Sequence, residues 1–260
     1  MTPLDLGRRR DVGALIETAF SAWFRHFPVF FTLALIVVAP LRVLIDGVWA
    51  GTLDEFDETG TPAPFLVSTL TSWIFMPALV TAMHVVAVQD LAHGRSPTIR
   101  RSLGVAVRLF PAVVLVLVLY GLGVVGGMVL LVIPGIWLAT RWYFGLQAAV
   151  VEGARGAAAL RRSAQLVDGT WWRVFGITLL VSILTSLFAL PLVLAGVLLH
   201  SAGIDDGVLV AVCQVLWDTL GISFTALTTT LLYFDLRVRR GAAETAEQRF
   251  AIAPERPHAV

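Results

Sequence analysis

The sequence contains no lysine and only one cysteine, and it is poor in charge of either sign. All nineteen cationic side chains are arginine. The single cysteine, Cys213, excludes an intrachain disulfide and a metal site built from several cysteines. Charged residues make up 14% of the chain, whereas soluble domains usually contain about 25%. The composition therefore argues against an ordinary soluble globular protein.

The chain is instead rich in apolar sequence, with 57% hydrophobic residues and a mean hydropathy of +0.83. A helix needs about 20 largely apolar residues to cross a hydrocarbon core of ~30 Å. Six segments approach that length, and they are residues 27–48, 65–88, 110–132, 136–151, 174–199 and 207–234. We therefore expect an all-α membrane bundle of six transmembrane helices. Residues 1–240 would form the integral membrane domain, and residues 241–260 a disordered cytoplasmic tail.

The third and fourth segments lie very close together, because only Ile133, Pro134 and Gly135 separate them. Two spans joined by a tight turn and a single re-entrant hairpin both fit this spacing. Within the third segment, Gly123 and Gly127 form a G-x-x-x-G pair. Such a pair predicts close packing of that span against a neighbouring helix.

Arginine is distributed unevenly along the chain. Two arginines, Arg42 and Arg141, fall inside the six segments, and the other seventeen lie on one side of the predicted membrane. The loops on the other side carry acids, which are Asp54, Glu55, Asp57, Glu58, Asp205 and Asp206. Positively charged flanks resist translocation and stay cytoplasmic. Because a composition without lysine and rich in Ala, Val, Leu and Gly is typical of GC-rich bacteria, we expect a bacterial inner-membrane protein with both termini in the cytoplasm.

Three predicted cytoplasmic stretches have the apolar spacing of amphipathic helices, and each precedes an odd-numbered segment. The apolar positions recur every three or four residues: Val12, Ile16, Phe20, Trp23 and Phe27; Ile99, Leu103, Val107 and Phe110; Leu160, Ala164, Val167 and Trp171. This pattern predicts interfacial helices with the apolar side in the acyl boundary and the arginines toward anionic headgroups. The expected partners are therefore the lipid bilayer and its anionic headgroups at the cytoplasmic face.

The same stretches share short motifs that suggest a threefold repeat of interfacial helix, span, outer turn and span. Ile99-Arg100-Arg101-Ser102 parallels Leu160-Arg161-Arg162-Ser163. Each even-numbered segment is followed by an acid, and these acids are Asp90, Glu152 and Asp235. Repetition of one helical unit accounts for the pattern, and so does convergence under the same membrane constraints.

Four strings carry a resemblance to a known family. They are Ile133-Pro134-Gly135-Ile136-Trp137, Glu152-Gly153, Ala158-Ala159-Leu160-Arg161-Arg162-Ser163 and Leu231-Leu232-Tyr233-Phe234-Asp235-Leu236-Arg237-Val238-Arg239. In these strings the chain resembles the glycerophosphoryl diester phosphodiesterase membrane-domain family over about residues 10–240. The family is named from relatives in which the membrane part is fused to a phosphodiesterase barrel, for which this chain has neither the length nor the acidic and histidine clusters. The resemblance therefore implies a membrane architecture and no activity.

Four ionisable residues fall inside the predicted spans, namely Arg42, Asp46, Arg141 and Asp218. A charge at the bilayer centre costs about 2.5–3.5 kcal/mol unless it is paired or hydrated. Arg42 and Asp46 are four residues apart and can pair on one helix, and Arg141 and Asp218 can pair between spans four and six. Such pairs either hold the bundle together or form a hydrated polar site in its outer half.

The sequence shows no catalytic constellation. Its histidines are scattered without metal-ligand spacing, and His84 either shuttles protons or packs as an aromatic. We expect no cofactor, no metal and no nucleic-acid partner. The favoured hypothesis is a non-enzymatic membrane component or scaffold in envelope or lipid-related physiology. The alternative is a small transporter or lipid-handling protein that uses the intramembrane charges, and an intramembrane enzyme comes third.

Overall fold

The computed structural model describes residues 4–53, 72, 75–201 and 207–252. All regular secondary structure in these residues is helical, which confirms the predicted all-α class. The helices in chain order are α1 (Val12–Arg25), α2 (Phe27–Leu53), α5 (Met76–Ala92), α6 (Ile99–Leu130), α7 (Val132–Arg141), α8 (Gly145–Glu152), α9 (Ala157–Val167), α10 (Trp171–Ser201) and α11 (Gly207–Ile252).

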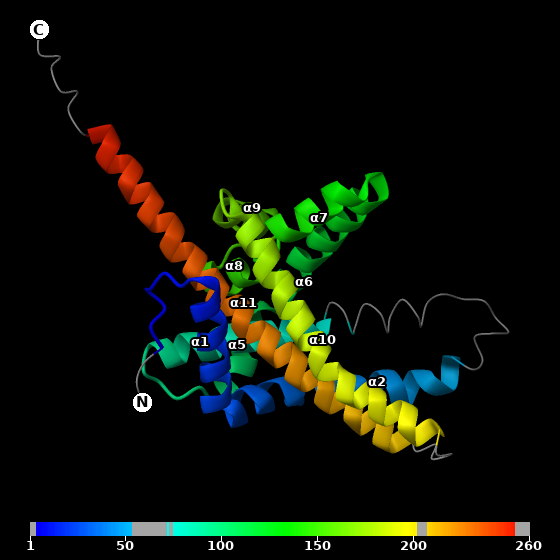
Figure 1. Cartoon of the computed structure of the whole chain (residues 1–260). Coiled ribbons are helices and arrows are strands. Elements are labelled where there is room, and N and C mark those ends of the chain that lie inside the picture. Colours follow the sequence, from blue (N-terminus) through cyan, green and yellow to red (C-terminus); the bar gives the residue numbers. More distant parts are fainter. Residues whose placement is uncertain (1–3, 54–71, 73–74, 202–206, 253–260) are drawn as a thin grey trace, which may run out of the picture.

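The longest of the described helices, α11, is the element around which the others pack (Figure 1). It contacts α1, α2, α5, α9 and α10. Its residues Leu227, Leu231 and Tyr233 are fully buried. Because lipid tails are as apolar as these side chains, helices in a membrane associate through close packing and polar contacts rather than through removal from water. α11 thereby joins helices that are far apart in the sequence.

Three of the described helices are long and apolar enough to cross a membrane. They are Phe27–Ile45 of α2, Ile99–Leu130 and Ala211–Ala242 of α11, and a fourth is added if α9 and Trp171–Leu187, bent by 102°, count as one span. By contrast, α5 has 17 residues, α7 has 10 and α8 has 8. The apolar helices support an integral membrane protein, and the count of six spans stays a prediction. Part of the predicted second span and all the acids of the outer loops lie outside the described residues.

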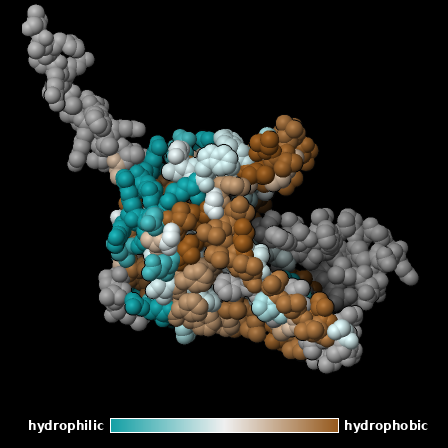
Figure 2. Space-filling view, in the orientation of Figure 1, coloured by the Kyte–Doolittle hydropathy of each residue, from teal (hydrophilic) through white to brown (hydrophobic). Residues whose placement is uncertain are grey.

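Polar and apolar side chains are segregated on the molecular surface. Figure 2 shows hydrophilic residues gathered at one end of the molecule, whereas hydrophobic residues cover the body and a projecting hairpin. The most exposed large hydrophobic side chains belong to that hairpin, where Val129, Leu130 and Ile133 are 81%, 79% and 80% exposed. Exposed apolar surface of this kind is expected of a protein that is embedded in lipid.

The first predicted interfacial helix, α1, packs one face on α11. Its buried residues are Leu15, Ala19, Ala22 and Trp23. The first turn of α1 is capped by Asp11, whose Oδ1 accepts a hydrogen bond from the Ala14 N–H at 2.7 Å. The predicted apolar stripe lies mostly beside this face and is partly exposed, so its contact with the acyl boundary stays a prediction.

The second predicted interfacial helix is the first part of α6, which continues without a break into the third span. Its buried residues are Ser102 and Ala106, while Ile99 and Val107 of the predicted apolar stripe are 40% and 59% exposed. The exposed stripe leaves room for the predicted contact with the acyl boundary, which stays a prediction. The small side chains of Ser102 and Ala106 instead let α6 approach its neighbours closely.

The third and fourth predicted segments form an antiparallel hairpin of α6 and α7. A Cβ atom at Gly127 would lie 3.0 Å from the Gly135 Cα, and one at Gly123 would lie 2.1 Å from a ring carbon of Trp142. The predicted close packing of the G-x-x-x-G pair is confirmed. The helical path then breaks at residues 142–144 before α8 begins, so the fourth segment is two short helices.

The C-terminal part of the chain also differs from the prediction. A disordered tail was predicted from Gly241, but α11 continues to Ile252, and residues 253–260 lie outside the described residues. The residues after Gly241 are mainly Ala, Glu, Gln and Arg, which are strong helix formers, and one glycine costs a helix only about 1 kcal/mol. A helix that is already fixed by the bundle therefore continues through this glycine.

Candidate functional site

The intramembrane charges meet in a different pair from the one predicted between helices. Arg42 of α2 donates from Nε to Oδ2 of Asp218 in α11 at 2.5 Å, and the two side chains are 24% and 17% exposed. The predicted pair of Arg141 with Asp218 is wrong, because Arg141 instead places its guanidinium 4.7 Å from the centroid of the Trp137 ring. The helix that carries Arg141 packs mainly on α6, whereas α2 packs on α11. The side chain of Asp46 lies outside the described residues.

One small cavity adjoins this ion pair, and a second shares part of its wall. One of about 270 Å³ is lined by Asp218 and Trp217, and the other, of about 230 Å³, by Tyr143 and Gln147. Both are lined by Pro77, Thr81 and Thr225. The predicted intramembrane site contains four charged residues. Among those whose side chains the structure describes, Asp218 lines one of these two cavities.

Gln147 supplies an unsatisfied acceptor in the second cavity. Its side chain is 3% exposed, its Nε2 donates to Oγ1 of Thr229 at 3.4 Å, and its buried Oε1 has no hydrogen-bond partner. Leaving a buried acceptor without a hydrogen bond costs about 1–3 kcal/mol. Such an atom therefore favours a polar ligand or a water molecule in the adjoining space. The sequence alone did not identify Gln147, because a lone glutamine in an apolar run has no spacing that marks it.

His84 belongs to a buried network that ties three helices together. Its Nδ1 lies 2.8 Å from the Val80 carbonyl and its Nε2 lies 2.9 Å from Oγ of Ser223. Trp23 of α1 donates from Nε1 to the same Oγ at 3.1 Å. The carbonyl can only accept, so Nδ1 carries the proton and Nε2 accepts from the serine. The network joins α1, α5 and α11, and His84 is a packed aromatic that also stacks on Phe30.

At the polar end of the molecule, Asp90 is held by arginines of the following segment. The carboxylate is 1% exposed, and its Oδ1 lies 2.9 Å from Nη2 of Arg95 and 3.2 Å from Nη1 of Arg101. The other oxygen, Oδ2, has no partner within the described structure. This junction fixes the end of α5 to the start of α6.

Glu152 occupies the equivalent place after α8. It accepts a hydrogen bond from Nε of Arg162 at 2.7 Å and from the Tyr233 hydroxyl at 2.7 Å, and Arg237 lies 3.4 Å away. Burial alone would raise the pKa of Glu152, but the hydrogen bonds from Arg162 and Tyr233 and the charges of the two arginines together hold it below its ordinary value. The carboxylate is therefore ionised at neutral pH.

Because the pKa of Glu152 is lowered, the stability that this group contributes is present above its unfolded pKa of about 4.5 and is lost as the pH falls through the folded value. We expect Glu152→Gln to lower the free energy of unfolding by about 1–2 kcal/mol at pH 7. The difference should shrink as the pH is lowered from 5 to 3. Thermal unfolding in detergent at several pH values measures it, and a difference that grows with acidification would contradict this assignment.

Asp235 forms the largest of the three junctions. It is 0% exposed, and its Oδ2 lies 2.7 Å from Nε of Arg239 and 3.3 Å from Nη2 of Arg173. Its Oδ1 accepts a hydrogen bond from the backbone N–H of Arg10 at 2.7 Å, while Arg173 donates to the Arg10 carbonyl at 2.6 Å. The third acid therefore reaches back to the N-terminal segment, just before α1 begins.

The two serines of the repeated motif have different environments. Ser163 of α9 accepts from the Phe144 N–H at 3.0 Å and donates to the Arg141 carbonyl at 2.9 Å, so it satisfies backbone groups at the break between α7 and α8. Ser102 is fully buried, and its hydroxyl has no partner within the described structure. Arg100 and Arg161, which precede the pairing arginines, are exposed.

Within the described part of the chain, no group of three or more His, Cys, Asp and Glu side chains could hold a metal ion. Searches with the chain found no matching protein-family model, curated protein or solved structure. The resemblance to the glycerophosphoryl diester phosphodiesterase membrane-domain family therefore stays a prediction.

Proposed function

We propose that this chain is a non-enzymatic component of the bacterial inner membrane that presents a fixed, arginine-rich cytoplasmic face to anionic headgroups and partner proteins. In this proposal both termini are cytoplasmic, and six helical segments cross the bilayer or enter it. The proposal includes membership of the family that the sequence resembles, and three structural repeats.

The observation that carries the proposal is the set of three acid–arginine junctions. Asp90 and Asp235 are almost completely buried, the side chain of Glu152 is 22% exposed, and each acid pairs with at least two arginines. Charges in this arrangement fix the helix ends relative to one another, because breaking a buried pair leaves an uncompensated charge. Arg100, Arg155 and Arg161 stay exposed on the same polar end. The result is a rigid cationic surface of the kind that attracts anionic lipids.

The equivalent positions of two junctions also support the repeat. Asp90 pairs with Arg101, and Glu152 pairs with Arg162, the matching arginine of the second motif. In both cases the acid follows an even-numbered segment and the arginine belongs to the next helix. Asp235 would close the series by bonding to the backbone of Arg10.

Photo-crosslinking in living cells tests the proposed function. A photoreactive amino acid is placed at Arg100 and at Arg161, and the control position is Leu187 of α10, which is 58% exposed on the apolar surface. We expect the same protein partner, together with anionic lipid, at both arginine positions and not at Leu187. Identical adducts at all three positions, or none at the arginine positions, would contradict the proposal.

The second candidate, a small transporter or lipid-handling protein, is favoured by the cavity beside Asp218. Substitutions in the Arg42–Asp218 pair distinguish this transporter from the non-enzymatic component proposed above. We expect Arg42→Gln and Asp218→Asn each to destabilise the protein by about 1–3 kcal/mol, because each removes one charge of a partly buried ion pair. The double variant should recover part of the loss and keep the crosslinks at Arg161. A double variant that folds as well as the wild type but abolishes uptake or export of a solute would favour the transporter.

A further inference from the structure

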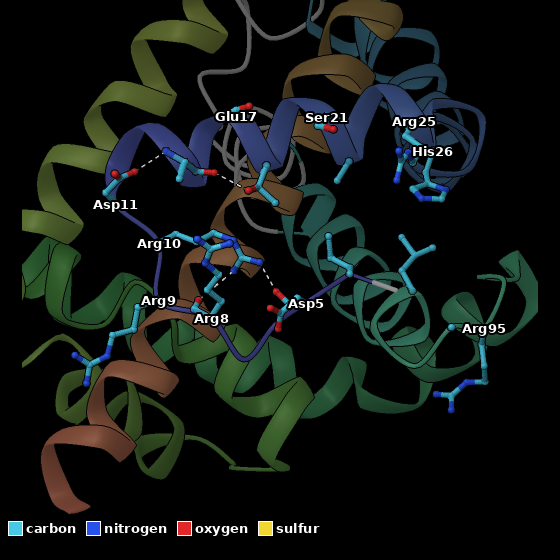
Figure 3. Close-up of a pocket in the computed structure, with 16 residues that line it drawn as sticks. Asp5, Arg8, Arg9, Arg10, Asp11, Glu17, Ser21, Arg25, His26 and Arg95 are labelled. Atoms are coloured by element: carbon cyan, nitrogen blue, oxygen red, sulfur yellow. Dashed lines mark hydrogen bonds between the residues drawn. The ribbon is translucent and has the colours of Figure 1, made fainter. Parts of the chain in front are cut away.

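A cavity lies at the polar end, between the N-terminal segment, α1 and the end of α5 (Figure 3). It measures about 530 Å³. Five arginines and three acids line it, and they are Arg8, Arg9, Arg10, Arg25, Arg95, Asp5, Asp11 and Glu17. Ligand sites commonly have volumes of about 300–1,000 Å³, so the cavity can hold a small polar headgroup.

Two of the three acids and three of the five arginines have interactions within the protein, and Arg25 is one of these arginines. Asp5 accepts a hydrogen bond from the Gly7 N–H at 2.9 Å, and Asp11 caps α1. The guanidinium of Arg10 donates to backbone carbonyls, and that of Arg95 pairs with Asp90. The carboxylates of Asp5 and Asp11 are thus directed at backbone N–H groups rather than at the arginines of the cavity.

The cavity lining has an excess of positive charge, because it contains five arginines and three acids. Arg8 forms no ion pair with any described residue. Arg25 and His26 lie together at one end of the cavity, with Arg95 on the facing wall (Figure 3). Burial, and then the charge of Arg25, hold the pKa of His26 below its ordinary value of 6.5. A neutral imidazole beside these guanidinium groups can donate a hydrogen bond to an anion without adding to their repulsion.

The depth of this cavity matches the headgroup layer. Arg25 and His26 directly precede Phe27, where the first candidate span begins. Leu91 and Gly94 of the opposite wall lie at the end of α5. Phe24, which precedes Arg25 in the sequence, is 65% exposed. Two helix ends and an exposed aromatic at one level are typical of a membrane boundary.

We propose that this cavity binds the phosphate group of an anionic phospholipid headgroup, such as phosphatidylglycerol, from the leaflet at the arginine-rich face. Guanidinium groups suit this ligand because they donate paired hydrogen bonds to phosphate oxygens. The N-terminal wall is held in place by the bonds between the Arg10 backbone and the Asp235 junction, so the site is preformed. The inference rests on the proposed orientation and names the ligand of one part of the cationic face.

A titration of the purified full chain in neutral detergent tests the site. The probes are dihexanoyl phosphatidylglycerol, dihexanoyl phosphatidylcholine and sodium phosphate at constant ionic strength, and the readout is the rise in the unfolding temperature as ligand binds. We expect phosphatidylglycerol to stabilise the wild type most. Arg8→Gln with Arg25→Gln should weaken its binding by about 10–30-fold. The matched control, Arg155→Gln with Arg161→Gln, removes the same charge from the cationic surface outside the cavity and should weaken phosphatidylglycerol binding far less than the pocket variant does.

A second variant tests the site without removing an arginine. Ser21→Glu adds a carboxylate at an exposed position in the cavity lining, one helical turn from Arg25, and should also weaken phosphatidylglycerol binding. Equal stabilisation by sodium phosphate or by phosphatidylcholine would overturn the choice of an anionic headgroup. Equal losses in the pocket and control variants, or no stabilisation by any probe, would overturn the site. Because the crosslinking positions lie on α6 and α9, a failed titration with unchanged crosslinks rejects this site alone.

Discussion

Asp235→Ala is expected to destabilise the protein by about 3–5 kcal/mol. The carboxylate is fully buried and bonds to Arg173, Arg239 and the backbone N–H of Arg10. Alanine would leave two guanidinium groups without their counter-charge and one N–H without its acceptor, and removing one partner of a buried pair costs an amount of this size. Three separate parts of the chain would lose their common anchor: the N-terminal segment, the start of α10 and the end of α11.

Thermal or denaturant unfolding in detergent measures this loss. The matched control is Asp168→Ala, which removes an exposed carboxylate at the end of α9 and should change stability by less than about 0.5 kcal/mol. Asp235→Asn should lie between the two, because an amide oxygen still accepts from the Arg10 N–H but carries no charge. If Asp235→Ala unfolds like the control, the junction does not hold the polar end together.

Gly135→Ala is expected to have the second largest effect, because it separates the two limbs of the α6–α7 hairpin. A Cβ atom at Gly135 would lie 2.3 Å from Cγ of Met128 and 2.8 Å from its backbone N. The methionine side chain can rotate away, but the backbone cannot move without displacing the helix. Overpacking of this kind costs about 1–3 kcal/mol.

Gly126→Ala provides the control in the same hairpin. No atom lies within 4 Å of a Cβ built at Gly126, so the substitution meets open space. It should raise stability by up to about 1 kcal/mol, since alanine favours a helix more than glycine does. Unfolding temperatures of the two variants should therefore shift in opposite directions. Equal shifts would show that the close approach of α6 and α7 does not matter for stability.

The sequence predicts local features of this fold better than it predicts which helices are neighbours. The all-α class and the packing role of Gly123 and Gly127 follow from composition and spacing, because both depend on short segments. Which residues of α6 meet its neighbours does not follow in this way. Ser102 and Ala106 are buried while Ile99 and Val107 are exposed, because in lipid the larger apolar side chains can face outward.

The candidate sites also show that the sequence does not predict which helices are neighbours. Asp218 was predicted to be paired because a charge in a span needs a partner, and it is, but with Arg42. Asp218 pairs with Arg42 because α2 and α11 are neighbours. The spacing of the spans along the sequence does not show which helices are neighbours. Gln147 and the network of His84 with Ser223 were not predicted, because isolated polar residues in apolar runs acquire meaning only once the helices are packed.

The length of α11 has a mechanical consequence. The helix has 46 residues and is therefore about 69 Å long, more than twice the thickness of a hydrocarbon core. From Arg237 to Ile252 it extends about 22 Å past the buried part of the bundle, as the red end in Figure 1 shows. A stiff rod of this length acts as a lever: tilting α11 by about 10° would move its end by about 4 Å. Small changes among helices in the bilayer would thus be carried outward as larger movements at the end of a single continuous helix.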